Sequence, residues 1–116
     1  MVERVLVVDD ELPVRNLVRM ALETEGFEVE TAANGREALE KLAKNRPHVV
    51  VLDLSMPGMD GGEVMDNMRE QGIETPVLFL SAYGAEEACR LHHAEGALDK
   101  PFDPYELIEK VKSLAA

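Results

Sequence analysis

Continuous apolar runs alternate with helix-like periodicity along this chain. The runs at 5–8, 49–52 and 77–80 contain no polar position, which is typical of strands buried on both faces. Residues 27–30 alternate between apolar and acidic side chains, as expected for an edge strand with one face in solvent. The segment 96–101 leaves room for only a very short fifth strand.

The segments between the predicted strands have apolar residues at helical spacing, about every third or fourth position. Asn34 and Asp60 each precede a Glu by three residues, which predicts capping boxes at two helix starts. Asp103 followed by a proline predicts the start of the last helix. The positions expected to face the core are Val14, Leu17, Val18, Ala21 and Leu22 within 12–25, Ala38, Leu39, Leu42 and Ala43, then Val64, Met65 and Met68, then Ala88, Cys89 and Leu91 within 85–95, and finally Leu107, Ile108, Val111 and Leu114.

Five alternations of strand and helix predict a parallel sheet with helices on both faces. Right-handed crossovers limit the possible topologies, and the uninterrupted apolar strands should be central. We therefore expect an α/β, flavodoxin-like doubly wound sheet of five strands in the order 2-1-3-4-5, with a truncated fifth strand. The length of 116 residues suits one domain, expected over residues 1–116.

Composition narrows the range of partners. Lys and Arg number 12 against 23 Asp and Glu, so the net charge is -11, which argues against direct contact with nucleic acid or an anionic membrane. No apolar run approaches the ~20 residues of a membrane span, and the start of the chain does not read as a secretory leader. The one cysteine, Cys89, excludes an internal disulfide, so we expect a cytoplasmic protein.

Polar residues follow the predicted central strands. In a doubly wound sheet, ligands bind outside the carboxyl ends of the strands, and these ends carry Asp9, Asp10, Asp53, Ser81 and Lys100. By itself, Asp53 also fits a polar strand terminator. Three close carboxylates repel one another unless a cation lies between them, and oxygen ligands suit Mg²⁺. The adjacent residues His92 and His93 are expected on the surface rather than in a metal site.

A carboxylate beside Mg²⁺, a hydroxyl and an ammonium group is suited to phosphoryl transfer. Asp53 would be the nucleophile, Asp9 and Asp10 would hold the metal, and Ser81 and Lys100 would stabilise charge on the phosphoryl oxygens. Taken singly, Lys100 fits a simple ion pair and Ser81 a helix cap. Their joint placement favours the chemical interpretation.

With these residues in place, the chain resembles the receiver domain of two-component response regulators. The resemblance covers nearly the whole chain and rests on the segments 7–11, 52–61, 80–82 and 100–102. It implies that Asp53 accepts a phosphoryl group from a phosphohistidine on a sensor histidine kinase or a histidine phosphotransfer protein. Such a protein is a signalling phosphoacceptor rather than an enzyme, and it relays the signal to a downstream protein target by conformational change.

The resemblance also implies individual roles around Asp53. Asp10, Asp53 and the backbone carbonyl of Ser55 would coordinate Mg²⁺ directly, and Asp9 would act through water. Ser81 and Lys100 would bind phosphoryl oxygens. The roles implied for the remaining residues are a cis peptide bond before Pro101, control of dephosphorylation by Ser55 and Tyr83, and kinase recognition by the first helix and the loop before Lys100.

One departure from the family concerns the segment before Lys100. The family has about five residues, one of them aromatic, between a Gly-Ala pair and the lysine, whereas only Leu98 and Asp99 separate Gly96-Ala97 from Lys100. We therefore expect the aromatic switch residue to be missing. Signalling would then use the loop 81–83 and a mobile fourth helix, whose apolar face is weak.

Three other functions remain as alternatives. A degenerate receiver would bind partners without being phosphorylated. An aspartyl-phosphate phosphatase would have a second Asp where Ser55 stands, and a flavin module would have a Ser/Thr/Gly-rich loop in place of the acids at 9–11. The end of the chain after the fifth helix suits a single-domain regulator, a phosphorelay intermediate or a receiver excised from a longer protein.

Overall fold

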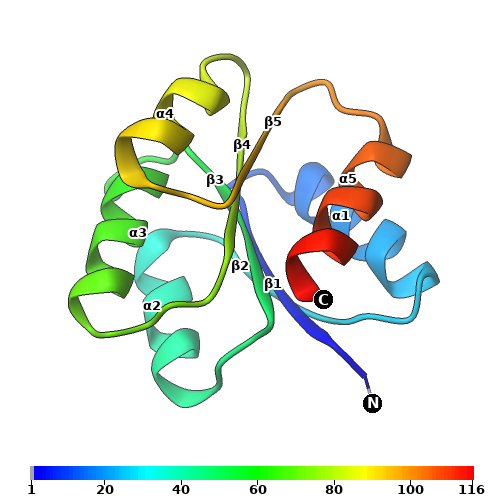
Figure 1. Cartoon of the computed structure of the whole chain (residues 1–116), viewed down its shortest axis with the longest axis horizontal. Helices are drawn as coiled ribbons and strands as arrows, with labels where there is room; N and C mark the ends of the chain where they lie inside the picture. Colours follow the sequence, from blue (N-terminus) through cyan, green and yellow to red (C-terminus); the bar gives the residue numbers. More distant parts are fainter. Residues whose placement is uncertain (1) are drawn as a thin grey trace.

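Strands and helices alternate five times in the computed structural model, which describes residues 2–116 (Figure 1). The strands are β1 (Arg4–Val8), β2 (Glu28–Ala32), β3 (Val49–Asp53), β4 (Val77–Ser81) and β5 (Gly96–Asp99). The helices are α1 (Leu12–Thr24), α2 (Gly35–Lys44), α3 (Gly61–Glu70), α4 (Ala85–His92) and α5 (Pro104–Ala115). The strands pair in parallel in the order β2-β1-β3-β4-β5, which confirms the predicted flavodoxin-like topology.

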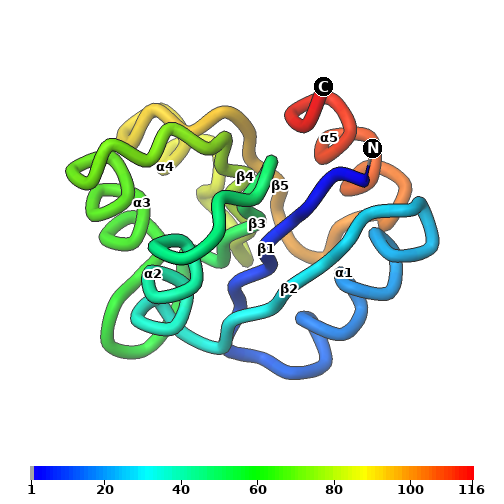
Figure 2. Tube along the Cα trace, turned by 90° about the horizontal axis from the view of Figure 1, so that it is seen from below, coloured from blue at the N-terminus to red at the C-terminus, as the bar shows by residue number. Residues whose placement is uncertain are grey.

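The sheet lies between two helical layers, with α2, α3 and α4 on one face and α1 and α5 on the other (Figures 1 and 2). Alternate strand residues enter two separate apolar clusters, so Leu6 and Val50 pack under α2 and α3, while Val5 and Val49 pack under α1 and α5. This explains the uninterrupted apolar runs of β1, β3 and β4, because both faces of each central strand are buried. The edge strand β2 alternates between exposed and partly buried positions, as predicted.

Three residues predicted to face the core are exposed. Leu17 is exposed because the buried face of α1 contains Val18 and Leu22, and Leu17 lies to the solvent side of that face. Ala43 is exposed in the last turn of α2. Leu91 is 70% exposed, because the inner face of α4 follows the spacing of Ala85, Ala88, Cys89 and His92. His92 is half-buried, with 27% of its side chain exposed, so the predicted surface position is only partly confirmed for His92; it is confirmed for His93, which is exposed.

The predicted capping box of α3 is confirmed, with Asp60 and Glu63 each accepting the other's backbone N–H. At α2, Asn34 accepts the N–H of Glu37 at 2.8 Å, but the Glu37 carboxylate accepts from Ala33 rather than from Asn34. The reciprocal half of that predicted box is therefore wrong, because the glutamate bonds one residue further back along the incoming chain.

The segment before Lys100 contains the predicted short strand. β5 has four residues where the other four strands have five, so the expected short strand is confirmed. However, Gly96 and Ala97 lie inside β5, opposite Leu78 and Phe79 of β4. The turn is made instead at His93, whose φ is 59°.

This turn restores the spacing that the family resemblance led us to expect. After His93 and Ala94, the residues before Lys100 are Glu95, Gly96, Ala97, Leu98 and Asp99, and none of the five is aromatic. The predicted deletion before Lys100 is therefore wrong, whereas the absence of an aromatic residue is confirmed. α4 has eight residues and is the shortest of the helices described. No helix within residues 2–116 has the length and apolar character that a membrane crossing needs.

Candidate functional site

The three predicted carboxylates meet at the carboxyl ends of β1 and β3. Asp9 directly follows β1 and is fully buried, Asp53 is the last residue of β3 and is 2% exposed, and Asp10 is exposed. Each offers an oxygen, and these oxygens all lie within 4.8 Å of one another. Adjacent parallel strands end at the same edge of a sheet, which explains how residues 44 positions apart meet.

Lys100 completes the site from the end of β5. Its Nζ lies 3.0 Å from Asp9 Oδ2, 3.5 Å from Asp53 Oδ1 and 3.8 Å from Glu11 Oε1. The Lys100–Pro101 peptide bond is cis, as predicted. Burial lowers the pKa of Lys100, but the hydrogen bond and charge of Asp9, followed by Asp53, outweigh burial, so the pKa lies above its usual value. Lys100 is therefore fully charged at neutral pH and compensates two buried acids.

Burial, which by itself lowers the pKa of Lys100, raises the pKa of Asp53. Desolvation and, after it, the negative charge of Asp9 raise the pKa of Asp53 from 3.8 to about 6, although Lys100 and the N–H of Ser55 act against this rise. The Ser55 N–H donates to Asp53 Oδ1 at 3.3 Å. Asp53 is thus mostly ionised at neutral pH, but its surroundings penalise the charge, and a cation held by the acidic cluster would stabilise it.

Ser81 lies at the end of β4, beside Asp99 of β5 in the strand pairing. Its hydroxyl donates to the main-chain carbonyl of Tyr83 at 2.6 Å and accepts the Tyr83 N–H at 3.3 Å. The Ser81 carbonyl accepts from the N–H of Lys100 at 2.6 Å. The hydroxyl is therefore held by its own loop, and the predicted contact with a phosphoryl oxygen requires it to leave Tyr83.

Two further residues of α1 and the loop before it support the site. Arg15 donates to the main-chain carbonyl of Asp9 at 2.8 Å, and the N–H of Glu11 donates to Asp9 Oδ1 at 2.9 Å. The Glu11 side chain also faces Lys100. Sequence reasoning did not assign a role to Arg15 or Glu11, since only the run of acids at 9–11 hinted at Glu11 and no local pattern marks Arg15.

Gly61, the first residue of α3, lies against the end of β3. A Cβ at this position would come within 2.5 Å of the Asp53 carbonyl oxygen and 2.9 Å of the Leu54 Cα. Both neighbours are backbone atoms, which cannot move without displacing Asp53. The glycine therefore lets α3 begin directly beside the predicted nucleophile.

Gly61→Ala is expected to destabilise the protein by about 2–4 kcal/mol, because the strand end must shift. Gly62→Ala is the matched control, since its Cβ would meet side-chain atoms of His92 rather than backbone, and alanine gains about 1 kcal/mol of helix propensity over glycine. Urea denaturation of both variants measures the difference. Equal stability of the two variants would contradict the close backbone approach at Gly61.

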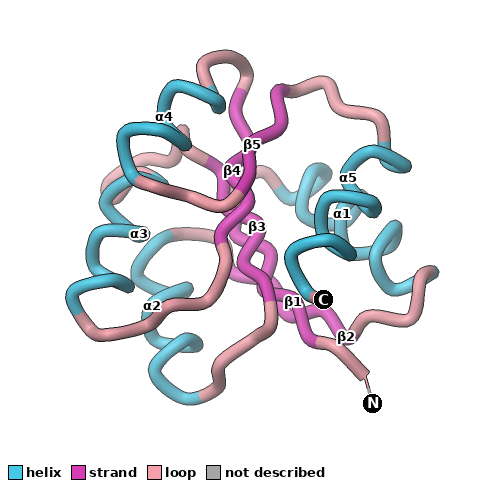
Figure 3. The backbone as a smooth tube through the Cα atoms, viewed as in Figure 1, coloured by secondary structure: helices cyan, strands magenta, loops and turns pink. Residues whose placement is uncertain are grey.

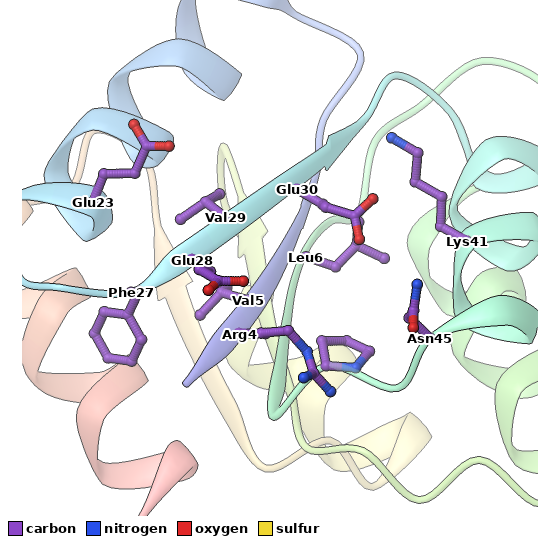
Figure 4. A pocket seen from close by; sticks show the side chains of 11 residues that line it. Arg4, Val5, Leu6, Glu23, Phe27, Glu28, Val29, Glu30, Lys41 and Asn45 are labelled. Carbon is purple, nitrogen blue, oxygen red and sulfur yellow. The ribbon is translucent and has the colours of Figure 1, made fainter. Parts of the chain in front are cut away.

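Two hollows differ in their relation to the site. One of about 290 Å³ is lined by the first residues of β1 and β2, with Lys41 and Asn45 of α2 and its C-cap, and lies away from the carboxylates (Figure 4). The other, of about 370 Å³, is mainly apolar and lies directly beside Lys100, lined also by Val14, Leu17, Pro101 and Phe102. Figure 3 shows β4 and β5 passing into loops at the end of the sheet that carries the site.

The geometry agrees with the comparisons to known proteins. Residues 5–112 match the response regulator receiver domain family. The chain belongs to this family. It is therefore a receiver domain of the two-component response regulators.

Individual relatives support this assignment. The transcriptional regulatory protein ResD of Bacillus subtilis is 44% identical over an alignment of 115 positions that covers 96% of this chain and 47% of ResD. The chain thus spans about half the length of this curated relative. The chemotaxis response regulator CheY4 of Vibrio cholerae superposes with a TM-score of 0.91 at 38% identity, covering 98% of this chain and 99% of CheY4. The response regulator TrrA of Thermotoga maritima, solved in complex with Mg²⁺ and BeF, has a TM-score of 0.87 at 38% identity, covering 97% and 98% of the two chains.

Proposed function

We propose that this receiver domain accepts a phosphoryl group on Asp53 from a phosphohistidine of a sensor histidine kinase or a histidine phosphotransfer protein. The observation that carries the proposal is the buried Asp53 carboxylate at the end of β3, within 3.5 Å of Lys100 and beside Asp9 and Asp10. An Asp53 oxygen attacks phosphorus, the N–P bond to the imidazole breaks, and the imidazole takes a proton from solvent. The products are an aspartyl phosphate and a free histidine.

The three carboxylates suit a hard divalent cation, and we assign Mg²⁺. All donors are oxygen atoms, and the exposed Asp10 leaves one side open to water. Asp10, Asp53 and the Ser55 carbonyl are the proposed direct ligands, with Asp9 acting through water. When bound, the cation supplies positive charge against the phosphoryl oxygens. The complex of the related TrrA with Mg²⁺ and BeF supports this assignment.

Lys100 and Ser81 have complementary proposed roles. Lys100 moves its ammonium from Asp9 to a phosphoryl oxygen, which is possible because Asp9 and Asp53 both lie within its reach. The Ser81 hydroxyl leaves the Tyr83 carbonyl for another phosphoryl oxygen. The domain promotes its own phosphorylation and slow hydrolysis but is not a turnover enzyme, because the product stays covalently attached. Ser55 and Tyr83, both exposed, control the access of water.

The partner that carries the phosphohistidine is proposed to dock on α1 beside the site. Leu12, Leu17 and Met20 expose 57%, 50% and 62% of their surface on this helix. Leu17 also lines the apolar hollow next to Lys100. An apolar surface that continues to the reacting carboxylate suits a protein partner rather than a nucleic acid or membrane. A cytoplasmic location follows from a kinase or phosphotransfer partner and from the single, unbridged Cys89.

Acetyl phosphate with Mg²⁺ is expected to add one phosphoryl group to the protein, detected by intact-mass spectrometry. An excess of chelator should abolish the adduct, because the three carboxylates then repel both one another and the incoming phosphate. Acetyl phosphate with a non-chelating salt of equal ionic strength is the control.

The rival functions give different outcomes in the same measurement. Absence of an adduct at all Mg²⁺ concentrations would favour a degenerate receiver that acts as an unphosphorylated interaction module. Steady hydrolysis of many phosphate esters would favour an aspartyl-phosphate phosphatase. A single adduct that requires metal supports the proposal.

A further inference from the structure

We propose that Asp99 is a positioning residue that caps α4 from β5 and thereby holds the Ser81 hydroxyl away from Asp53 until phosphorylation. The proposal rests on the proposed function and extends it to the way this domain signals without an aromatic residue in β5. In this proposal the carboxylate of Asp99, the residue before Lys100, connects the site to α4.

The cap consists of a contact between two separate elements. Asp99 Oδ1 accepts the N–H of Ala85, the first residue of α4, at 3.2 Å. The local N-cap residue is Gly84, which has no side chain that can accept a hydrogen bond and has φ 81°. The first N–H groups of a helix have no partner within the helix, so an acceptor must come from elsewhere. Asp99 supplies this acceptor from 14 residues further along the chain.

Asp99 is also joined directly to the site. It lies opposite Ser81 in the pairing of β4 with β5, and the N–H of the next residue, Lys100, donates to the Ser81 carbonyl at 2.6 Å. The loop from Ser81 to Ala85 is therefore held at two points. One is the bond from the Ser81 hydroxyl to the Tyr83 carbonyl, and the other is the bond from Ala85 to Asp99. Movement of the hydroxyl to a phosphoryl oxygen breaks the first bond and pulls on the second.

α4 is short and weakly packed, so loss of one cap has a large effect on it. Within this helix, all of whose residues are described, Ala85 alone is buried. Eight residues are too few for a helix to be stable without tertiary support. Beneath its start, a hollow of about 370 Å³ is lined by Gly84, Ala97 and Asp99, together with charged residues of α4 and α5. Leu98 is the one large apolar side chain among its lining residues, so little apolar contact replaces the cap.

The test is amide hydrogen exchange of Ala85, measured by NMR in wild type and Asp99→Ala, with and without Mg²⁺ plus beryllium fluoride as phosphoryl analogue. In metal-free protein, Asp99→Ala is expected to exchange this amide about tenfold faster than wild type. In wild type, the analogue should raise exchange at Ala85 toward the variant's rate. In Asp99→Ala, the analogue should change it by less than about twofold.

Asp103→Ala is the matched control, because Asp103 caps a different helix, α5, by accepting the Tyr105 N–H at 2.9 Å. This variant should keep both the wild-type exchange of Ala85 and its response to the analogue. Asp99→Asn retains an acceptor oxygen and should restore most of the protection. If Asp99→Ala does not fold, Asp99→Leu is the test variant, because leucine is similar in shape to aspartate but has no acceptor. A wild-type response of Ala85 exchange to the analogue in a folded variant without the acceptor overturns the proposal.

Failure of this proposal can be separated from failure of the proposed function. If wild type takes up a phosphoryl group from acetyl phosphate but Ala85 exchanges at the same rate with and without the analogue, the role of Asp99 is overturned and Asp53 phosphorylation stands. If no phosphoryl group is taken up, the proposed function fails, and unchanged Ala85 exchange in metal-free Asp99→Ala would then overturn the cap as well.

Discussion

Asp53→Asn is expected to take up no phosphoryl group from acetyl phosphate and, without metal, to be about 3 kcal/mol more stable than wild type at pH 7.5. The first effect follows because an amide cannot replace the carboxylate nucleophile. The second follows from the pKa of Asp53, which folding raises from 3.8 to about 6, a displacement that corresponds to about 3 kcal/mol. Intact-mass spectrometry and urea denaturation in chelator measure the two effects.

The sign of the stability effect depends on pH. The raised pKa means that the folded state holds the Asp53 proton more tightly than the unfolded chain. Below about pH 4 both states are protonated and the variant has no advantage. As pH rises from about 4 to 6, the unfolded state ionises first, so wild type loses stability relative to Asp53→Asn. Above about pH 6 the difference is constant, and Mg²⁺ should reduce it by binding the folded wild type.

Glu74→Gln is the control for this comparison, because it removes one exposed acid of the loop between α3 and β4. Its free energy of unfolding should stay within about 0.5 kcal/mol of that of wild type, both at pH 7.5 and below about pH 4. Equal stability of Asp53→Asn and wild type in chelator at pH 7.5 would contradict the cost assigned to the buried carboxylate. The acetyl phosphate measurement would then still decide the role of Asp53 in phosphorylation.

Lys100→Met is expected to lower stability in chelator by about 3–5 kcal/mol at pH 7.5, because it leaves the buried Asp9 and Asp53 without their cation. The side chain of Lys100 is 19% exposed and methionine has a similar volume, so loss of charge rather than of packing dominates. Mg²⁺ should recover part of the loss. Phosphoryl uptake from acetyl phosphate should slow by about 10²-fold, since a positive charge at the phosphoryl oxygens is missing.

Lys112→Met provides the matched control on α5. Its ammonium pairs with Glu25 at 2.8 Å, but this pair lies on the surface, where solvent screens ion pairs and leaves them a small contribution to stability. Its phosphorylation rate should equal that of wild type. If the two lysine variants lost the same stability and reacted equally fast with acetyl phosphate, Lys100 would be a surface ion pair without a role in the site.

The site could be predicted because its residues end strands whose order is set by local pattern. Apolar runs of four residues identify β1, β3 and β4, and parallel pairing then brings together whatever follows each strand. Asp9, Asp10, Asp53 and Lys100 therefore meet as predicted, with the cis bond before Pro101. Whether the Ser55 carbonyl binds metal stays a prediction, as do the chemical roles of the site residues.

The region around α4 could not be predicted in the same way. The family resemblance takes Gly96-Ala97 as the pair that precedes the fifth strand, but both residues lie in β5, where they pair with Leu78 and Phe79, and His93 takes the left-handed conformation before the strand. The ring of His92 packs edge-on against Phe79, and its Nδ1 lies 3.0 Å from Asp66. Helical periodicity does not predict either contact.

The residue pattern alone was enough to predict the fold, the edge and central strands, and the side chains that lie at the strand ends. The reason is that burial on one or two faces imposes a characteristic periodicity on a strand or helix. The tertiary structure decided which polar groups satisfy one another. Arg15 on the Asp9 carbonyl, Glu37 on Ala33 and Asp99 on Ala85 are such contacts. They depend on which N–H and C=O groups remain unpaired once the elements pack, and this is settled only when distant segments meet.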